Sequence, residues 1–151
     1  MDIEHLKELI ADHSKHPRNK QVLETWTHTC EGKNPLCGDE ICIRLQIEQA
    51  QIVTAAFQGR GCGISQASAS ILTETVQGLS ITDCLQIYET LHAKILNQTP
   101  PNLPPPLHEV WEELEPLVEI RLNPMRVKCV TLAWHTLHHA LIGLDTASSE
   151  H

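Results

Sequence analysis

The sequence predicts a single α+β domain in which a small three-stranded antiparallel sheet carries about five helices, packed mainly on one face. Two patterns predict this class: apolar and polar residues alternate in one part of the chain, and apolar residues recur at helical spacing elsewhere. The chain has 151 residues, the size of one ordinary domain. Apolar residues make up 41% of it but aromatic residues only 3%, so aliphatic side chains must fill the core.

The N-terminal region is expected to form a helix and then a strand. The helix is predicted from Asp2 to about His13, with Asp2 as the cap of its first turn. Its apolar residues recur at helical spacing: they are Ile3, Leu6, Leu9 and Ile10. The pattern ends near Pro17, and β propensity then predicts the first strand over residues 25–29, around Trp26.

The clearest strand runs from Asp39 to Glu48, where every second residue is apolar. The apolar face carries Ile41, Ile43, Leu45 and Ile47. A second alternation, at Val53, Ala55 and Phe57, follows after a short connection. These two segments predict a hairpin, and with the first strand they make an antiparallel meander.

The rest of the domain is predicted to be helical. A glycine-rich loop around Cys62 leads into a helix over residues 64–77. A further helix begins with Ser80 and Asp83 as a variant capping box.

Prolines then interrupt the helices. Residues 97–106 contain five prolines and are expected to form an exposed linker. A short amphipathic helix around Trp111 follows, and the last helix is predicted from about Val127 to Leu144. The single domain is thus expected to span residues 1–145, with a flexible tail at 146–151.

The charge balance disfavours two classes of partner. Nineteen acidic and eleven basic residues give a formal charge of −8, which disfavours binding to nucleic acid or to an anionic membrane.

No apolar run approaches the roughly 20 residues that span a bilayer, and Met1 leads into amphipathic sequence rather than a signal peptide. We therefore expect a cytoplasmic protein, in which cysteines are metal ligands, reactive thiols or core residues rather than disulfides.

Cys37 and Asp39 are the first candidate metal ligands. They lie two residues apart at the entrance to a strand, where an extended backbone points both side chains to the same side. Gly38 between them allows a backbone conformation that other residues resist. The triplet alone is weak evidence, because chance produces it often.

Cys62 and Cys129 each lie at the predicted start of a helix, where free N–H groups and the helix dipole favour a thiolate. The positive charges of Arg126 and Lys128 are expected to favour ionisation of Cys129 further. Together with Cys37 and Asp39, these residues form a set of three thiolates and one carboxylate, which suits zinc and could also hold iron. The ligands are far apart in sequence, so the metal should stabilise the fold.

The other cysteines and the histidines have simpler interpretations. Cys84 lies on an apolar helical stripe and is expected in the core, whereas Cys42 lies on the polar face of its strand as a partly exposed thiol. Cys30 is expected to end the first strand, where it could also be a peripheral thiol near the site. A solvated helix face is favoured over a metal site for the histidines of the last helix: His135, His138 and His139.

Three segments each contain a residue already selected as a ligand. They are NPLCGDEI at 34–41, GRGCGISQASASILTE at 59–74 and RVKCVTLAW at 126–134. Together they resemble a known family, the SufU branch of the NifU/IscU-like iron-sulfur cluster assembly proteins. Lys128 stands where IscU-type proteins carry a histidine before the last cysteine, and the stretch at about 96–125 resembles the SufU-type insertion. Gly63 departs from the serine or alanine more usual in this family.

The resemblance implies a SufE/NifU-like fold and a zinc-dependent sulfurtransferase that works with a SufS-type cysteine desulfurase. Cys37 would accept the terminal sulfur of the desulfurase's cysteine persulfide and pass it to downstream iron-sulfur assembly proteins. Zinc bound by Cys37, Asp39, Cys62 and Cys129 would hold Cys37 as a weak nucleophile until a partner side chain displaces it. Arg126 would assist docking or stabilise the thiolate.

Two other interpretations stay open. The first is a scaffold on which a [2Fe-2S] cluster is assembled on Cys37, Cys62 and Cys129 and then transferred, without enzymatic activity; Lys128 argues against it. The second is a structural zinc module that recruits partners, which requires that all four ligands stay permanently bound.

Overall fold

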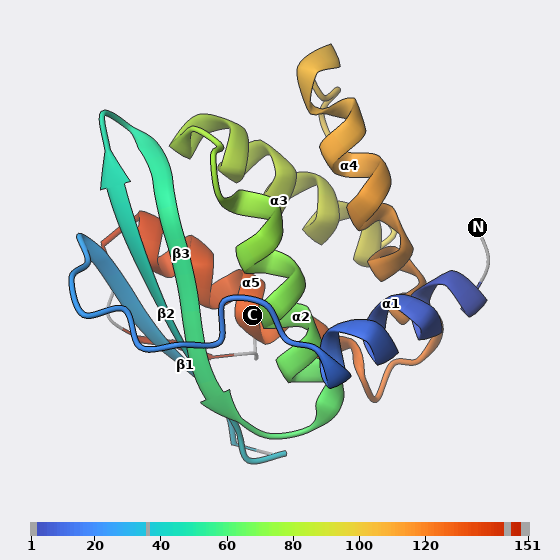
Figure 1. The fold of residues 1–151 in the computed structure, drawn as a ribbon. Helices are drawn as coiled ribbons and strands as arrows, with labels where there is room; N and C mark the ends of the chain where they lie inside the picture. Colours follow the sequence, from blue (N-terminus) through green and yellow to red (C-terminus); the bar gives the residue numbers. More distant parts are fainter. Residues whose placement is uncertain (1–2, 36, 144–145, 149–151) are drawn as a thin grey trace.

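The computed structural model describes residues 3–35, 37–143 and 146–148 of the chain. The chain begins with helix α1 (Ile3–Lys15) and then forms a meander of three strands (Figure 1). Helices and the final strand follow. The strands are β1 (His28–Asn34), β2 (Asp39–Glu48), β3 (Gln51–Arg60) and β4 (Thr146–Ser148). The later helices are α2 (Gly63–Val76), α3 (Ile81–Ile95), α4 (His108–Leu114) and α5 (Val127–Leu141), with 3₁₀ segments η1 (Pro105–Leu107) and η2 (Glu115–Leu122).

The sheet has the order β3-β2-β1-β4, and its first three strands are antiparallel, as predicted. A two-residue turn joins β2 to β3, where Gln49 and Ala50 take φ values of 51° and 62°. Such a turn matches the right-handed twist of the paired strands. At the opposite end of β2, Asp39 pairs with Asn34 of β1, so only four residues connect the two strands there.

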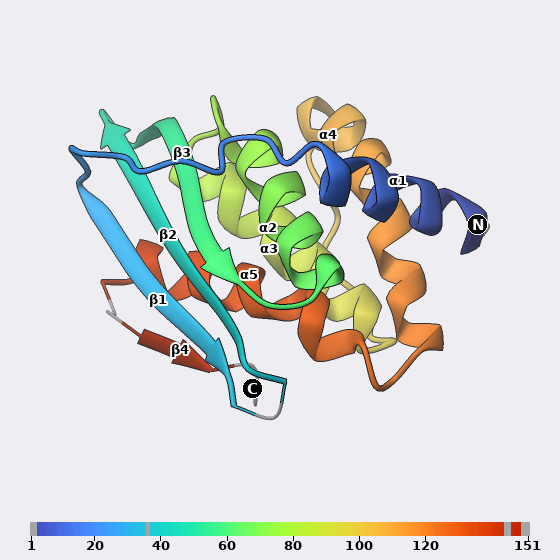
Figure 2. The same cartoon turned by 60° about the horizontal axis from the view of Figure 1, so that its bottom comes forward.

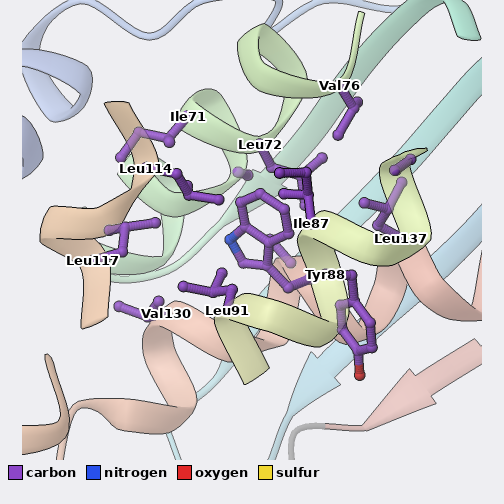
Figure 3. Close-up of a cluster of buried hydrophobic side chains, with 14 of the residues drawn as sticks. Ile71, Leu72, Val76, Ile87, Tyr88, Leu91, Leu114, Leu117, Val130 and Leu137 are labelled. Carbon is purple, nitrogen blue, oxygen red and sulfur yellow. The ribbon is translucent and has the colours of Figure 1, made fainter. Parts of the chain in front are cut away.

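The helices cover one face of the sheet (Figure 2). Helix α5 packs on β1 and β2, and α2 packs on β3. Three apolar side chains of β2 point to the helices and are fully buried, namely Ile41, Ile43 and Leu45, whereas Ile47 is half-buried. Figure 3 shows the hydrophobic cluster that α2, α3, α4, η2 and α5 bury between them, with Tyr88 among its side chains. The predicted α+β class and the one-sided packing are confirmed, although Trp134 and Phe57 also lie in the core.

The predicted first strand was placed too early in the chain. Residues 25–29 were expected, but β1 begins at His28 and continues to Asn34, with Cys30 inside it rather than at its end. Trp26 is 41% exposed, and its ring lies 3.9 Å from the guanidinium carbon of Arg44. Pairing with β2 therefore determines where β1 begins and ends. Trp26, whose β propensity suggested the strand, precedes it.

The C-terminal expectations were partly wrong. Helix α5 ends at Leu141, and Gly143 follows it with a φ of 85°. Residues 146–148 of the expected tail form β4, because the outer edge of β1 offers unpaired backbone groups to a parallel strand. Residues 149–151, Leu144 and the predicted cap Asp2 lie outside the described residues.

The predicted linker and the segment after it cover the helical layer. Residues 98–104 form neither helix nor strand, as the prolines predicted, and Ser80 caps α3 by accepting a hydrogen bond from the Asp83 N–H at 3.0 Å. Helix α4 and η2 pack on one another, and η2 also contacts α1 and α3. None of the helices in the described part of the chain is long and apolar enough to cross a membrane.

Candidate metal centre

Three segments bring the predicted ligands together: the turn between β1 and β2, the loop between β3 and α2, and the first turn of α5. In the first segment the N–H groups of Cys37 and Gly38 donate to the Asn34 carbonyl at 3.3 and 2.9 Å. Gly38 has a φ of +73°, so it supplies the left-handed conformation expected from the sequence. This turn leaves the Cys37 thiol exposed to solvent.

Asp39 is the buried carboxylate of the site, with 1% of its surface exposed. Its Oδ1 accepts a hydrogen bond from the Cys62 N–H at 2.9 Å, and the Cys62 thiol lies 3.8 Å from its Oδ2. Gly61 makes this approach possible, because a Cβ at this position would collide with Asp39 Oδ1. Its φ of +143° is also one that other residues rarely adopt.

Cys62 is the N-cap of α2, as its position in the glycine-rich loop predicted. Its Sγ accepts a hydrogen bond from the Ser65 N–H at 3.4 Å. The side chain of Ser65 in turn donates to the Cys62 carbonyl at 3.0 Å. These contacts orient the sulfur toward Asp39 at the start of the helix and supply partial positive charge to it.

Cys129 lies in the first turn of α5 and is completely buried. Its ligand atom and those of Cys37 and Asp39 all lie within 4.8 Å of one another. Cys62 joins this group through its contacts with Asp39 and through a hydrogen bond with Cys129. Cys37, Asp39 and Cys129 therefore form one group, and Cys62 lies beside it in contact with Asp39.

The electrostatics of Cys129 differ from the expectation. Burial raises the pKa of its thiol to about 12, and the hydrogen bond with Cys62 acts in the same direction. Arg126 hydrogen-bonds to Cys129 and lowers this pKa, as predicted, but the effect of burial is larger. Lys128 is half-buried, and no contact among the described residues gives it a part in the site. A bound divalent cation would reverse this balance, because a coordinating thiol loses its proton.

The donor set suits zinc. Three sulfur atoms and one carboxylate match the tetrahedral coordination that zinc prefers in proteins, and the same set could bind iron. Asp39 and Cys129 are buried while Cys37 is exposed, so the ligands are not equally accessible. Buried ligands can therefore hold a metal while the Cys37 thiol stays accessible to the solvent.

The remaining cysteines behave largely as expected. Cys84 is fully buried in the core, and burial raises its pKa to about 12. Cys42 is half-buried on the outer face of the sheet, with its Sγ 3.9 Å from Thr29 Oγ1. Cys30 is buried within β1 and so is not a peripheral thiol.

The expectation of a solvated histidine face on the last helix was wrong. His135 is only 6% exposed, and its Nδ1 lies 2.9 Å from the Tyr88 hydroxyl. The His138 ring stacks on the Tyr88 ring with their centroids 4.7 Å apart. The helical spacing of these histidines could not show that α3 would cover them.

Helix α1 is a neighbour of the site that the sequence did not indicate. It packs against α2, and a Cβ on Gly63 would lie 2.9 Å from the Ser14 hydroxyl. The glycine that departs from the family pattern therefore occupies the contact between α1 and the Cys62 loop. In the sequence, Gly63 was the one feature that could have indicated the contact between α1 and the Cys62 loop.

Comparison with known proteins supports this architecture. The family model described as the NifU-like N-terminal domain matches residues 5–146. The chain is 34% identical to the iron-sulfur cluster assembly scaffold protein IscU of Streptococcus pyogenes serotype M1, over 88% of this chain and 80% of that protein. It is 33% identical to the zinc-dependent sulfurtransferase SufU of Bacillus subtilis strain 168, over 87% and 85% of the two chains.

A solved structure agrees with these relatives. It is that of FiSufU, a SUF-system protein from Fervidobacterium islandicum AW-1, with a TM-score of 0.76 and 31% identity. The match covers 89% of this chain and 94% of that one. The family expected from the three motifs is thus confirmed, and the chain belongs to the NifU-like N-terminal domain family.

Proposed function

We propose that the protein is a zinc-dependent sulfurtransferase of iron-sulfur cluster assembly, which accepts sulfur on Cys37 from a SufS-type cysteine desulfurase. The observation that carries the proposal is the unequal exposure of the ligands. Cys37 faces the solvent, while Asp39 and Cys129, with ligand atoms within 4.8 Å of its sulfur, are buried. An exposed thiol beside a buried donor set suits a residue that must meet another protein's sulfur.

The proposed transfer is a thiol exchange. The Cys37 thiolate attacks the terminal sulfur of the donor's protonated cysteine persulfide, and a new S–S bond forms on Cys37. The donor's own S–S bond breaks, and its cysteine leaves as a thiolate. The proton stays on the transferred sulfur, so the exchange requires no external oxidant or reductant.

The other three ligands hold the site while Cys37 reacts. Zinc, when bound, lowers the pKa of the thiols so that Cys37 is held as a thiolate. Asp39 and Cys62 are joined by the hydrogen bond of 2.9 Å, and Cys129 is anchored in α5. Asp39 and Cys129 are buried and Cys62 is half-buried at the N-cap of α2, so these three residues are held by the fold while the exposed Cys37 meets a donor.

Alanine formation by a SufS-type cysteine desulfurase tests the proposal. The zinc-loaded protein is added in iron-free buffer, and its effect is compared with that of Cys37→Ala and of Cys42→Ala, a control on the outer face of the sheet. We expect strong stimulation by the wild type and by Cys42→Ala and none by Cys37→Ala. Equal rates with and without the wild type would disprove sulfur acceptance.

A [2Fe-2S] scaffold is the second candidate, because the Streptococcus pyogenes relative is named as a scaffold. In that case, iron and sulfide would be cargo, held by Cys37, Cys62 and Cys129. Anaerobic reconstitution followed by visible absorption spectroscopy distinguishes the two functions. A stable cluster spectrum that is lost in Cys129→Ser, without stimulation of the desulfurase, would favour the scaffold.

A further inference from the structure

We propose that the groove between α1, the start of α2 and η2 is the docking site for the sulfur-donating protein, which inserts an apolar side chain flanked by a carboxylate. This inference rests on the proposed function and names the surface that brings the donor to Cys37. It does not follow from the ligand set, because α1 contributes none of the ligands.

The groove has a volume of about 440 Å³. One wall is a stripe of α1, and the other is formed by η2 and the loop that precedes α5. Its lining is mainly apolar, and Ile3 at the outer end is 36% exposed. The apolar side chains of the lining are Ile3, Leu6, Ile10, Ala11, Ile64 and Ile120.

The inner end of the groove is continuous with the candidate metal centre. Cys62 and Gly63 line it directly, and so does Arg126. Arg126 also hydrogen-bonds to Cys129. A side chain seated in the groove therefore places its parent chain beside the thiols that the donor must reach.

Charge determines which partner suits the groove. Arg126 lies at the inner end and Lys7 on the α1 wall, where Lys7 pairs with the exposed Glu4 at 3.6 Å. Among the described residues of the lining, the one acidic side chain is that of Glu119, which lies 3.8 Å from the guanidinium of Arg121. An apolar anchor with a neighbouring carboxylate complements this arrangement.

A protein that donates sulfur suits the groove better than a second copy of this chain. Direct attack on a persulfide requires the donor's cysteine at Cys37, so the donor must cover the surface beside it. Two copies of the chain each carry a formal charge of −8 and repel one another. We therefore assign the groove to the donor.

The test fills the groove without removing a ligand. Ala11 is exposed and lines the groove, so Ala11→Trp should block it while the helix is retained. His5→Trp places the same side chain on the same helix, at a position outside the groove lining. Ile3→Glu provides a second groove variant in the first turn of α1. Each full-length, zinc-loaded variant is checked for zinc content and for thermal unfolding.

Two quantities are measured: the affinity for a SufS-type desulfurase by calorimetry and the concentration that half-saturates its stimulation. We expect Ala11→Trp and Ile3→Glu to weaken both by about tenfold and His5→Trp to change them by less than about twofold. Cys37→Ala should lose stimulation but keep its affinity, which separates docking from sulfur acceptance.

The outcomes are distinguishable. If the folded, zinc-loaded groove variants keep wild-type affinity and half-saturation, the docking site is wrong and sulfur acceptance stands. If the wild type binds without stimulating and the groove variants bind weakly, docking stands and sulfur acceptance fails. A wild type that does not bind the desulfurase overturns both. Groove variants that change only the oligomeric state in sedimentation would assign the groove to a second copy and overturn the proposal.

Discussion

Two glycines separated by one residue have opposite roles beside the candidate metal centre. Gly61 has a φ of +143°, and a Cβ there would lie 2.9 Å from the Asp39 Cα and closer still to its carboxylate. Gly63 has an ordinary backbone conformation, and its nearest neighbour is the end of the Ser14 side chain. A side chain at position 61 would collide with the backbone and carboxylate of Asp39. A side chain at position 63 would meet only the end of the Ser14 side chain, which can rotate away.

We therefore predict that Gly61→Ala lowers the free energy of unfolding by about 2 to 4 kcal/mol and reduces zinc retention. Gly63→Ala should change stability by less than about 1 kcal/mol, because Ser14 can turn away and alanine favours the helix. Urea unfolding and zinc analysis of the purified variants measure both effects. Equal behaviour of the two variants would contradict the roles assigned here.

At the scale of elements, we expect the stability of the contact between α3 and α5 to depend on pH. Tyr88 and His92 of α3 face His135 and His138 of α5, with ring centroids 4.7 to 6.0 Å apart. Burial lowers the pKa of His138 below 6.5, and the neighbouring His139 and His92 act in the same direction, opposed by the negative charge of Glu89. The folded protein thus disfavours the imidazolium that the unfolded chain accepts.

The contact between α3 and α5 should lose stability at low pH. Stability from this contact is complete above the unfolded pKa of about 6.5 and is lost as pH falls below it, where the unfolded state binds more protons. We predict that His138→Phe, which keeps the stack on Tyr88, loses less stability than wild type between pH 7.5 and 5.5. Urea unfolding of both zinc-loaded proteins at the two values checks this. His5→Phe, at an exposed position of α1, should retain the wild-type pH dependence.

At the scale of the whole molecule, the proposed metal ligands join the strand layer to the helical layer. Cys37 lies in the connection of β1 and β2, Asp39 at the start of β2, Cys62 at the N-cap of α2, and Cys129 in α5. A metal that binds only the folded chain stabilises it in proportion to the logarithm of its free concentration. The site should therefore act as a link across the fold.

We predict that zinc at a hundredfold excess over its dissociation constant stabilises the protein by about 2.7 kcal/mol and raises its melting temperature by roughly 5 to 10 °C. Calorimetry before and after chelation measures the difference. Cys129→Ser should abolish the dependence on zinc, and Cys42→Ser on the outer sheet face should retain it. A melting temperature that is insensitive to chelation in the wild type would contradict the link.

Much of the architecture could be predicted because its signals are local. The alternation in β2 and the capping of α3 by Ser80 follow from side-chain periodicity and from hydrogen bonds three residues apart. The start of β1 could not be predicted, because its pairing with β2 overrides the propensity of residues 25–29. The burial of His135 likewise depends on α3, which lies about 45 residues earlier in the chain.

The sequence by itself determined the α+β class, the identity of Cys37, Asp39, Cys62 and Cys129 as candidates, and the family to which their motifs belong. Only the tertiary structure decided that Cys37 is exposed while Asp39 and Cys129 are buried, and that α1 forms a groove leading to Cys62. The physical reason is that each motif consists of residues that are close together in the sequence. Burial, pKa values and grooves arise from contacts between segments that are distant in the chain.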